Sequence, residues 1–323
     1  MDWSLVFGNA VAELISPTTA AYALAAIGLA VHFGYTGLLN FGQAAFMAIG
    51  AYGFAVSILN FGFSFWGAIA VSIGLSIVFA LILGIPTLRL RSDYLAIVTI
   101  ASAEILRYVV STTSMVGLTG GSNGLSAFGF QFYDMNPFPA GNYLFWPFDV
   151  TEKELWVRVV GWALVILASL LVLVMMRSPW GRVVKGIRED EDAVRSLGKN
   201  VFAFKMQALI IGGVLGAIGG MFYVLPTSLQ ADAMGRNMTF LIWTAMLLGG
   251  AATIWGPVLG SILFFALRIF IQGTVDILVP DAILNTQQTE QFSWIMVGVA
   301  LMLLVIFRPQ GILGDKKELN FNV

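Results

Sequence analysis

Side chains able to do catalytic chemistry are scarce in this sequence. His32 is the only histidine, and there is no cysteine. A zinc site or a Ser-His-Asp triad would therefore depend on His32 alone, and thiolate chemistry is excluded. The nucleophile pattern Gly-x-Ser-x-Gly and the metalloprotease pattern His-Glu-x-x-His do not occur. We therefore expect that this chain is not an enzyme and that it holds no metal and no cofactor.

The sequence also contains no Walker A loop. Gly198-Lys199 is followed by Asn200, where that motif has Ser or Thr, and position 193 is Ala, where it begins with Gly. If the protein moves a solute at the expense of ATP, the ATPase must be another chain.

Two opposite charges lie within one apolar stretch, 93–112. Glu104 and Arg107 are three residues apart, so a helix would place them on one face, where they can form an ion pair. Ionisable groups in a membrane span are costly and usually face the protein interior or a wet cavity. Two interpretations stay open: a polar point on a translocation path or gate, and a structural pair that locks helix packing.

The segment 34–53 is rich in glycine and carries two amides, Asn40 and Gln43. Within a membrane, non-helical backbone is tolerated only where it is buried in protein or lines a cavity. Broken helices of this kind build transport pathways, so both amides are candidate pathway or gate residues. The alternative is a simple interfacial loop.

A second charged region, 177–205, has a short helix pattern in its middle. Four consecutive acids, at 189–192, fill the predicted first turn, where the helix dipole favours negative charge. Glu191 and Arg195 are four residues apart, in the better orientation for an ion pair.

This short helix carries a small apolar patch, formed by Ala193, Val194 and Leu197, and Gly198 is placed to end it. A surface helix of about ten residues is not stable alone in water. We therefore expect its apolar patch to pack against another surface. The alternative is a solvated loop.

Small residues recur at helical spacing in two apolar stretches. Gly212, Gly216 and Gly220 form a doubled GxxxG face, and Gly256 and Gly260 repeat the spacing. Such faces let two helices approach closely in a membrane. They predict tight packing, either within this chain or against another subunit.

The elements that position these residues follow from composition. Of the 323 residues, 58% are hydrophobic and only 11% are charged, and the 17 basic residues do not exceed the 18 acidic ones. A soluble domain has about 25% charged residues, and a nucleic-acid binder needs a basic excess. The composition therefore predicts an all-α, polytopic membrane protein in a lipid bilayer, with no nucleic-acid partner.

A spanning helix needs about 20 mostly apolar residues. Nine stretches qualify, and the range is eight to ten because 238–250 is short and residues 3–15 form either an interfacial helix or a further span. The predicted spans are 17–33, 44–60, 65–84, 93–112, 156–175, 206–225, 238–250, 256–272 and 291–307. We treat the chain, 1–323, as a single transmembrane domain, since no linker divides it.

Basic residues set the predicted orientation, because loops on the cytoplasmic side carry an excess of Lys and Arg. Nine alternating spans place three basic clusters on the same side of the membrane, which we therefore predict to be cytoplasmic. The segment 177–205 and the C-terminus lie on this side. The long segment 113–155 then lies outside. The clusters are Arg89 and Arg91; Arg177, Arg182, Lys185, Arg188, Arg195, Lys199 and Lys205; and Arg308, Lys316 and Lys317.

Taken together, five stretches resemble LivM-type permease subunits of the branched-chain amino-acid ABC importers. They occur in the family's order within residues 17–310. They are 34–53, 87–104, 119–125, 178–205 and 248–260.

The resemblance implies a bacterial or archaeal inner-membrane protein that imports branched-chain or other apolar amino acids by alternating access. It implies a second permease subunit, two cytoplasmic ATPases that bind ATP and Mg²⁺, and an external substrate-binding protein. It also implies that the short helix is a coupling helix that docks on an ATPase, although Asp192 stands where the family's usual Glu-Ala-Ala start has its first Ala. Its residues would be Arg188, Glu191, Asp192, Ala193, Val194, Leu197 and Gly198.

Other functions stay open at this point. The same machine could import urea, short amides or another small solute, because substrate choice resides largely in the binding protein. A different class is an ATP-independent channel or carrier. A proton-coupled carrier usually needs buried carboxylates or histidines for its proton relay, and Glu104 is the one acid that we place clearly within a span.

Overall fold

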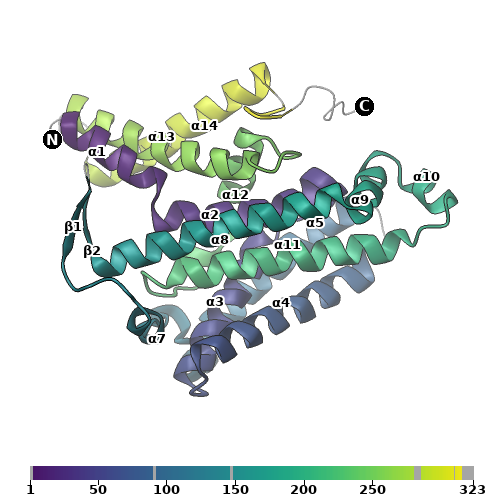
Figure 1. Cartoon of the computed structure of the whole chain (residues 1–323), viewed down its shortest axis with the longest axis horizontal. Coiled ribbons are helices and arrows are strands. Elements are labelled where there is room, and N and C mark those ends of the chain that lie inside the picture. Colours follow the sequence, from purple (N-terminus) through teal and green to yellow (C-terminus); the bar gives the residue numbers. More distant parts are fainter. Residues whose placement is uncertain (1–2, 90–91, 146–147, 280–284, 309, 315–323) are drawn as a thin grey trace.

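The protein is a bundle of long helices with short elements at both ends (Figure 1). The computed structural model describes residues 3–89, 92–145, 148–279, 285–308 and 310–314. Three of the basic residues named above, Arg91, Lys316 and Lys317, lie outside these residues.

Each of the nine predicted spans corresponds to a helix. These helices are α2 (Pro17–Leu29), which continues as a π-helix, η1 (Ala30–Tyr35); α3 (Gln43–Leu59); α4 (Phe65–Thr87); α5 (Ser92–Ser111); α8 (Glu152–Arg177); α11 (Val201–Val224); α12 (Arg236–Gly249); α13 (Gly256–Leu278); and α14 (Thr286–Phe307). Within the described residues, six helices are long and apolar enough to cross a membrane, and α3 is a shorter apolar helix. The prediction of a polytopic helical membrane protein is confirmed.

Several helices extend beyond the predicted apolar stretches because capping residues, not hydropathy, set their ends. Thr151 and Glu154 form a capping box that starts α8 at Glu152. The side chain of Asn200 accepts a hydrogen bond from the Ala203 N–H and starts α11 at Val201. The predicted spans were bounded by the apolar residues, whereas these two helices begin among the polar residues that precede them.

The remaining elements lie before, after and between the long helices. They are α1 (Trp3–Leu14), η2 (Thr113–Met115), α6 (Val116–Thr119), η3 (Gly121–Asn123), α7 (Phe130–Asp134), β1 (Asn142–Phe145), β2 (Phe148–Thr151), α9 (Pro179–Glu189), α10 (Glu191–Ser196) and η4 (Asp232–Met234). The antiparallel pair β1–β2, with Tyr143 opposite Val150, was not predicted. Aromatic and β-branched residues such as these favour strands.

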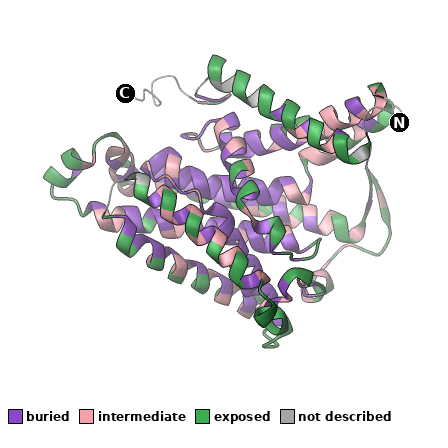
Figure 2. Ribbon diagram, turned by 180° about the vertical axis from the view of Figure 1, so that it is seen from behind, coloured by how far each residue is buried: buried purple, intermediate pink, exposed green. Residues whose placement is uncertain are grey.

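The helix α11 is the centre of the bundle and packs against α2, α3 and α4. Figure 2 shows the interior helices as mostly buried and α10 and α14 as largely exposed. The strands β1 and β2 lie at one end of the bundle and α10 at the other (Figure 1), which we call the hairpin end and the α10 end.

Basic residues from two of the predicted clusters meet at the α10 end. Arg89 lines a cavity of about 360 Å³ there together with Arg195 and Lys199. The described C-terminal segment packs on the end of α12, where the Ile312 N–H donates to the Leu248 carbonyl. This grouping agrees with the positive charge pattern used to predict the topology.

Candidate functional site

A break between α2–η1 and α3 lies in the core of the bundle. Residues 37–42 are non-helical, as the glycine-rich sequence of 34–53 predicted. The segment is held by three side chains, His32, Asn40 and Gln43, all fully buried. The Asn40 amide Nδ2 lies 3.0 Å from His32 Nδ1 and 3.1 Å from Gln43 Oε1.

These side chains connect the break to α11. His32 Nε2 lies 3.0 Å from the Leu209 carbonyl oxygen, which can only accept, so Nε2 carries the proton and Nδ1 accepts from Asn40. The Gln43 amide donates to the carbonyls of Ala25 and Gly212 at 3.1 and 3.2 Å. Both amides therefore have partners for all their hydrogens, and the break is fixed to its neighbours.

Further hydrogen bonds tie the break to α5 and α12. The Phe41 N–H donates to Thr99 Oγ1 at 3.1 Å, and the Ala44 N–H to Thr239 Oγ1 at 3.0 Å. The indole of Trp243 donates to the Asn40 carbonyl at 3.0 Å. In this conformation Asn40 and Gln43 are packed inside the bundle and do not line an open path. Their role as pathway or gate residues stays a prediction.

The predicted ion pair in α5 is present. Arg107 Nη2 lies 3.1 Å from Glu104 Oε2, and both side chains are less than one fifth exposed. The pair belongs to a larger network, because Arg107 Nη1 also contacts Asp232 at 2.8 Å and Arg236 contacts Glu104 at 3.3 Å. The network joins α5 to η4 and the start of α12. Such a network can fix the packing of these elements or can move with them during transport. Both interpretations, a structural pair and part of a gate, therefore stay open.

The glycine face of α11 packs within the chain. A Cβ at Gly212 would overlap the His32 ring and the Gly28 carbonyl, and one at Gly220 would overlap the Met47 carbonyl. At Gly216 it would lie 2.6 Å from Gln43 Nε2. The α11 glycines therefore let α2 and α3 approach closely.

The second glycine pair does the same at another helix contact. A Cβ at Gly256 would overlap the Gly250 carbonyl, and one at Gly260 would overlap the Ala245 carbonyl. These glycines therefore bring α13 against α12 and the turn that joins them.

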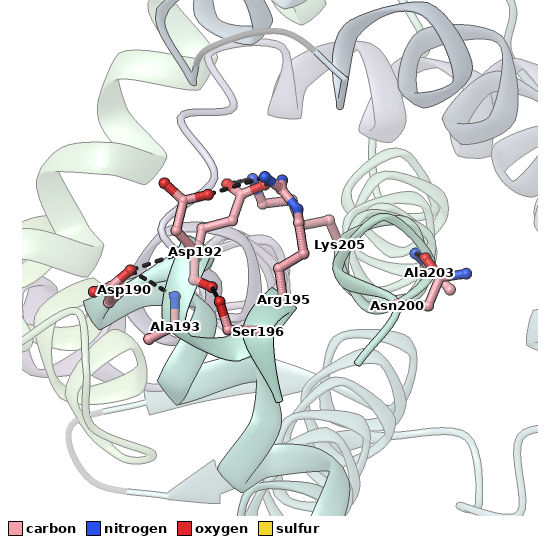
Figure 3. Close-up of polar contacts among 9 residues, drawn as sticks. Asp190, Asp192, Ala193, Arg195, Ser196, Asn200, Ala203 and Lys205 are labelled. Atoms are coloured by element: carbon pink, nitrogen blue, oxygen red, sulfur yellow. Dashed lines mark hydrogen bonds and ion pairs between the residues drawn. The ribbon is translucent and has the colours of Figure 1, made fainter. Parts of the chain in front are cut away.

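The charged segment 177–205 forms two helices rather than one, which corrects the prediction. Glu189 ends α9, and Asp190 takes an extended conformation as the N-cap of α10. Its carboxylate accepts from the N–H groups of Asp192 and Ala193, both at 3.0 Å (Figure 3). Because Asp190 serves as the N-cap, only Glu191 and Asp192 of the four acids lie in the first turn of α10. Asp is a favoured N-cap residue, so it can start a second helix directly after the first one ends.

Ion pairs hold α10 in place. Arg195 contacts Glu191 at 2.8 Å, as the spacing predicted, and Asp192 at 2.9 Å. Lys205, a buried lysine on α11, also pairs with Glu191 (Figure 3). Glu191 therefore connects the short helix to the central helix of the bundle.

The apolar patch of α10 is divided. Val194 faces inward and packs with Ile187 and Val201, so it needs no outside partner. Ala193 is exposed and the Leu197 side chain is 78% exposed. Gly198 has a φ of +76°, the left-handed conformation that ends a helix at this position. The free part of the patch is therefore Ala193 and Leu197.

Several residues of these sites were not predicted. Thr99, Thr239 and Trp243 were missed because their partners lie far away in the sequence and isolated polar groups in apolar helices give no pattern. Lys205 carried a detectable signal, since it is a lone charge at the start of an apolar stretch and such a charge needs a partner.

At the hairpin end, a cavity of about 480 Å³ lies between α7 and the segment that follows α11. Its lining includes Tyr133, Asp134, Lys153 and Pro226. Burial raises the pKa of the Tyr133 hydroxyl, which donates to the Leu225 carbonyl. The cavity has an apolar wall with one charge of each sign.

Comparison with known proteins finds a matching family model and several relatives. Residues 12–307 match the family model described as "Branched-chain amino acid transport system / permease component". The chain is 29% identical over 314 residues to the high-affinity branched-chain amino acid transport system permease protein LivM of Escherichia coli K12, covering 93% of this chain and 69% of that protein.

An archaeal relative and a distant structure were also found. A probable branched-chain amino acid transport permease protein LivM of Methanocaldococcus jannaschii is 26% identical, with 91% of both chains covered. A solved structure, PsaBC from Streptococcus pneumoniae in complex with Fab, aligns over 92% of this chain and 90% of that chain. Its TM-score of 0.44 and identity of 15% are too low to bear on the site.

Proposed function

Because the chain belongs to the branched-chain amino acid transport permease family, we propose that it is a membrane-spanning subunit that imports branched-chain amino acids. The observation that carries this proposal is the family match, which extends from α2 through α14. Urea, short amides and other solutes are not favoured, because the relatives that align over more than 90% of the chain are branched-chain amino acid permeases.

We further propose the partners that such an importer needs. These are a second permease subunit, two ATPases that bind ATP and Mg²⁺, and an external substrate-binding protein. ATP binding would close the ATPases, shift the coupling helices and open the permease to one side and then the other. A bundle interior with few fixed charges suits an apolar amino acid that passes without tight binding.

The orientation follows from the charge pattern. Basic residues of two clusters, Arg89, Arg195 and Lys199, line one cavity at the α10 end, so we propose that this end faces the cytoplasm. The hairpin end, with the segment 113–155 and its cavity, would then receive the binding protein.

We propose that α10 is the helix that docks on an ATPase. Its exposed surface offers Leu197 and Ala193, while its inner face is fixed by Val194 and by the Glu191–Lys205 pair. A large exposed apolar side chain on a rigid helix is suited to a partner's pocket. Arg188, which was predicted to belong to the same helix, lies on α9 and donates to the Gly34 carbonyl.

The docking role can be tested with Leu197→Asp. We expect this variant to lose the ATPases, measured by co-purification of the tagged permease from membranes, because a carboxylate cannot be buried in an apolar pocket without a partner. Folding should be unaffected, since the side chain is exposed.

The matched control is Leu144→Asp. Leu144 is also an exposed leucine, 86% accessible, but it lies on β1 at the hairpin end. It should retain the ATPases. Retention by Leu197→Asp would remove α10 as the docking helix. Failure of the wild-type chain to bind any ATPase would favour the ATP-independent channel or carrier instead.

A further inference from the structure

Arg188, on the last turn of α9, points into the bundle. Its side chain is only 15% exposed, and its Nη1 donates to the carbonyl oxygen of Gly34 at 2.5 Å. Gly34 belongs to η1, the last part of the helix before the break. The guanidinium therefore joins the charged segment 177–205 to the start of the broken segment.

This contact satisfies one of the last carbonyls of η1. The last carbonyls of a helix have no partner within it. Here the Val31 carbonyl accepts from Thr36 Oγ1 and the His32 carbonyl from the Leu38 N–H, both at 2.8 Å, and the Phe33 carbonyl from the Gly37 N–H at 3.0 Å. The Gly34 carbonyl is satisfied from α9. A cation also suits the negative end of the helix dipole.

The fit around this contact is close. Lys185, one turn earlier on α9, lies with Nζ 5.7 Å from the centre of the Tyr35 ring. Gly37 has a φ of +75°, and a Cβ there would lie 3.3 Å from Arg188 Cγ. On its other side, a Cβ at Gly34 would overlap the Ala251 carbonyl. Residues 34–37 therefore lie directly between α9 on one side and Ala251 on the other.

The helices α9 and α10 are connected firmly enough to move together. Only Asp190 separates them, and its N–H donates to the Gly186 carbonyl at 2.9 Å while its side chain caps α10. Ile187 of α9 and Val194 of α10 also pack in one cluster with Val201.

We propose that Arg188 is the positioning residue that transmits movement of α10 to the broken segment 37–42. It does so through the Gly34 carbonyl, and thereby acts on the network of His32, Asn40 and Gln43. The inference rests on the proposed function, because it requires an ATPase that moves α10. It separates two roles within one charged segment: Leu197 docks, and Arg188 transmits.

The test is the number of leucine molecules imported per ATP hydrolysed. The full complex, with partner permease, ATPases and leucine-loaded binding protein, is reconstituted in liposomes with Arg188→Gln. We expect the ATPases to stay bound and import per ATP to fall about tenfold. A role in folding alone would lower the amount of complex without changing this ratio.

Two further variants sharpen the result. Arg188→Lys keeps a cation that can donate to the Gly34 carbonyl and should recover part of the ratio. Arg182→Gln removes an exposed arginine from the same helix and should stay within about twofold of wild type, as surface substitutions usually do. An unchanged ratio in Arg188→Gln would overturn the proposal.

A second measurement needs no variant. Amide hydrogen exchange of the wild-type complex should change at Gly37 and Leu38 when a non-hydrolysable ATP analogue binds. No change there would also overturn the proposal. If the wild-type complex assembles but does not import leucine, the proposed function itself fails, and the inference falls with it.

Discussion

At the scale of single residues, the buried amides at the helix break carry the most weight. Asn40 and Gln43 donate four hydrogen bonds through their amide groups. The acceptors are the ring of His32, the side-chain oxygen of Gln43 and two backbone carbonyls. Buried polar groups are tolerated when they are hydrogen-bonded and destabilising when they are not. The network therefore fixes one geometry of the break.

Replacing Asn40 by Leu should expose this dependence. The change leaves His32 Nδ1 and Gln43 Oε1 without their donor, which should lower the free energy of unfolding by about 1–3 kcal/mol. Thermal unfolding in detergent measures the loss. The control is Asn123→Leu, at an exposed asparagine, which should be neutral. An unchanged melting temperature in Asn40→Leu would contradict the account.

Only some of these residues could be identified from the sequence. The Glu104–Arg107 pair follows from helical spacing, because both partners lie within one turn. Asp232 and Arg236 could not be added, since their contact with α5 depends on how distant segments pack. The amides at 40 and 43 were conspicuous in a glycine-rich stretch, whereas their partner His32 was not, because a histidine at a helix end is usually a packing residue.

At the scale of elements, the glycine face of α11 explains how α2 and α3 come close to the central helix. In lipid, helices gain little from hydrophobic association, so close packing of small residues has to supply the attraction. The spacing of Gly212, Gly216 and Gly220 was visible in the sequence. The identity of the facing helices was not, because intrachain and intersubunit packing use the same residues.

Gly220→Ala tests this packing. The added methyl group meets the Met47 carbonyl, and the resulting strain should cost about 1–3 kcal/mol. The matched control is Gly74→Ala on α4, where an added Cβ has nothing within 4 Å and better helix propensity should stabilise by up to about 1 kcal/mol. Urea or detergent denaturation compares the two. Equal stability of both variants would show that α11 is packed differently.

The charged segment 177–205 shows what local sequence patterns cannot predict, because it breaks into α9 and α10 at Asp190. Four acids in a row fit the first turn of one helix, yet Asp190 caps a second helix instead. Capping depends on the backbone angle at one residue, and that angle is fixed here by Ile187, Val194 and Val201, which pack together from three helices.

At the scale of the whole molecule, the sequence predicted the helices well because hydropathy is a strong signal in a membrane. It did not predict β1 and β2, since four-residue strands in an aromatic loop give no periodicity. It also could not reveal that Lys205 and Arg188 connect α10 and α9 to the rest of the bundle, because these contacts join distant segments.

The orientation of the molecule can be measured directly. The natural chain has no cysteine, so a single introduced cysteine reports one position. With a membrane-impermeant maleimide, Leu144→Cys at the hairpin end should be labelled in intact cells. Ser196→Cys on α10 should be labelled only after permeabilisation. Labelling of Ser196→Cys in intact cells would invert the topology.

The central claim is that the chain is the permease of an ATP-driven importer. The most direct measurement is leucine accumulation in liposomes that contain this chain, its partner permease and the ATPases, with loaded binding protein on the outer side. The account predicts accumulation against a gradient that requires ATP, the ATPases and the binding protein together. Leucine that merely equilibrates across the membrane, at the same rate without ATP or ATPases, would contradict it.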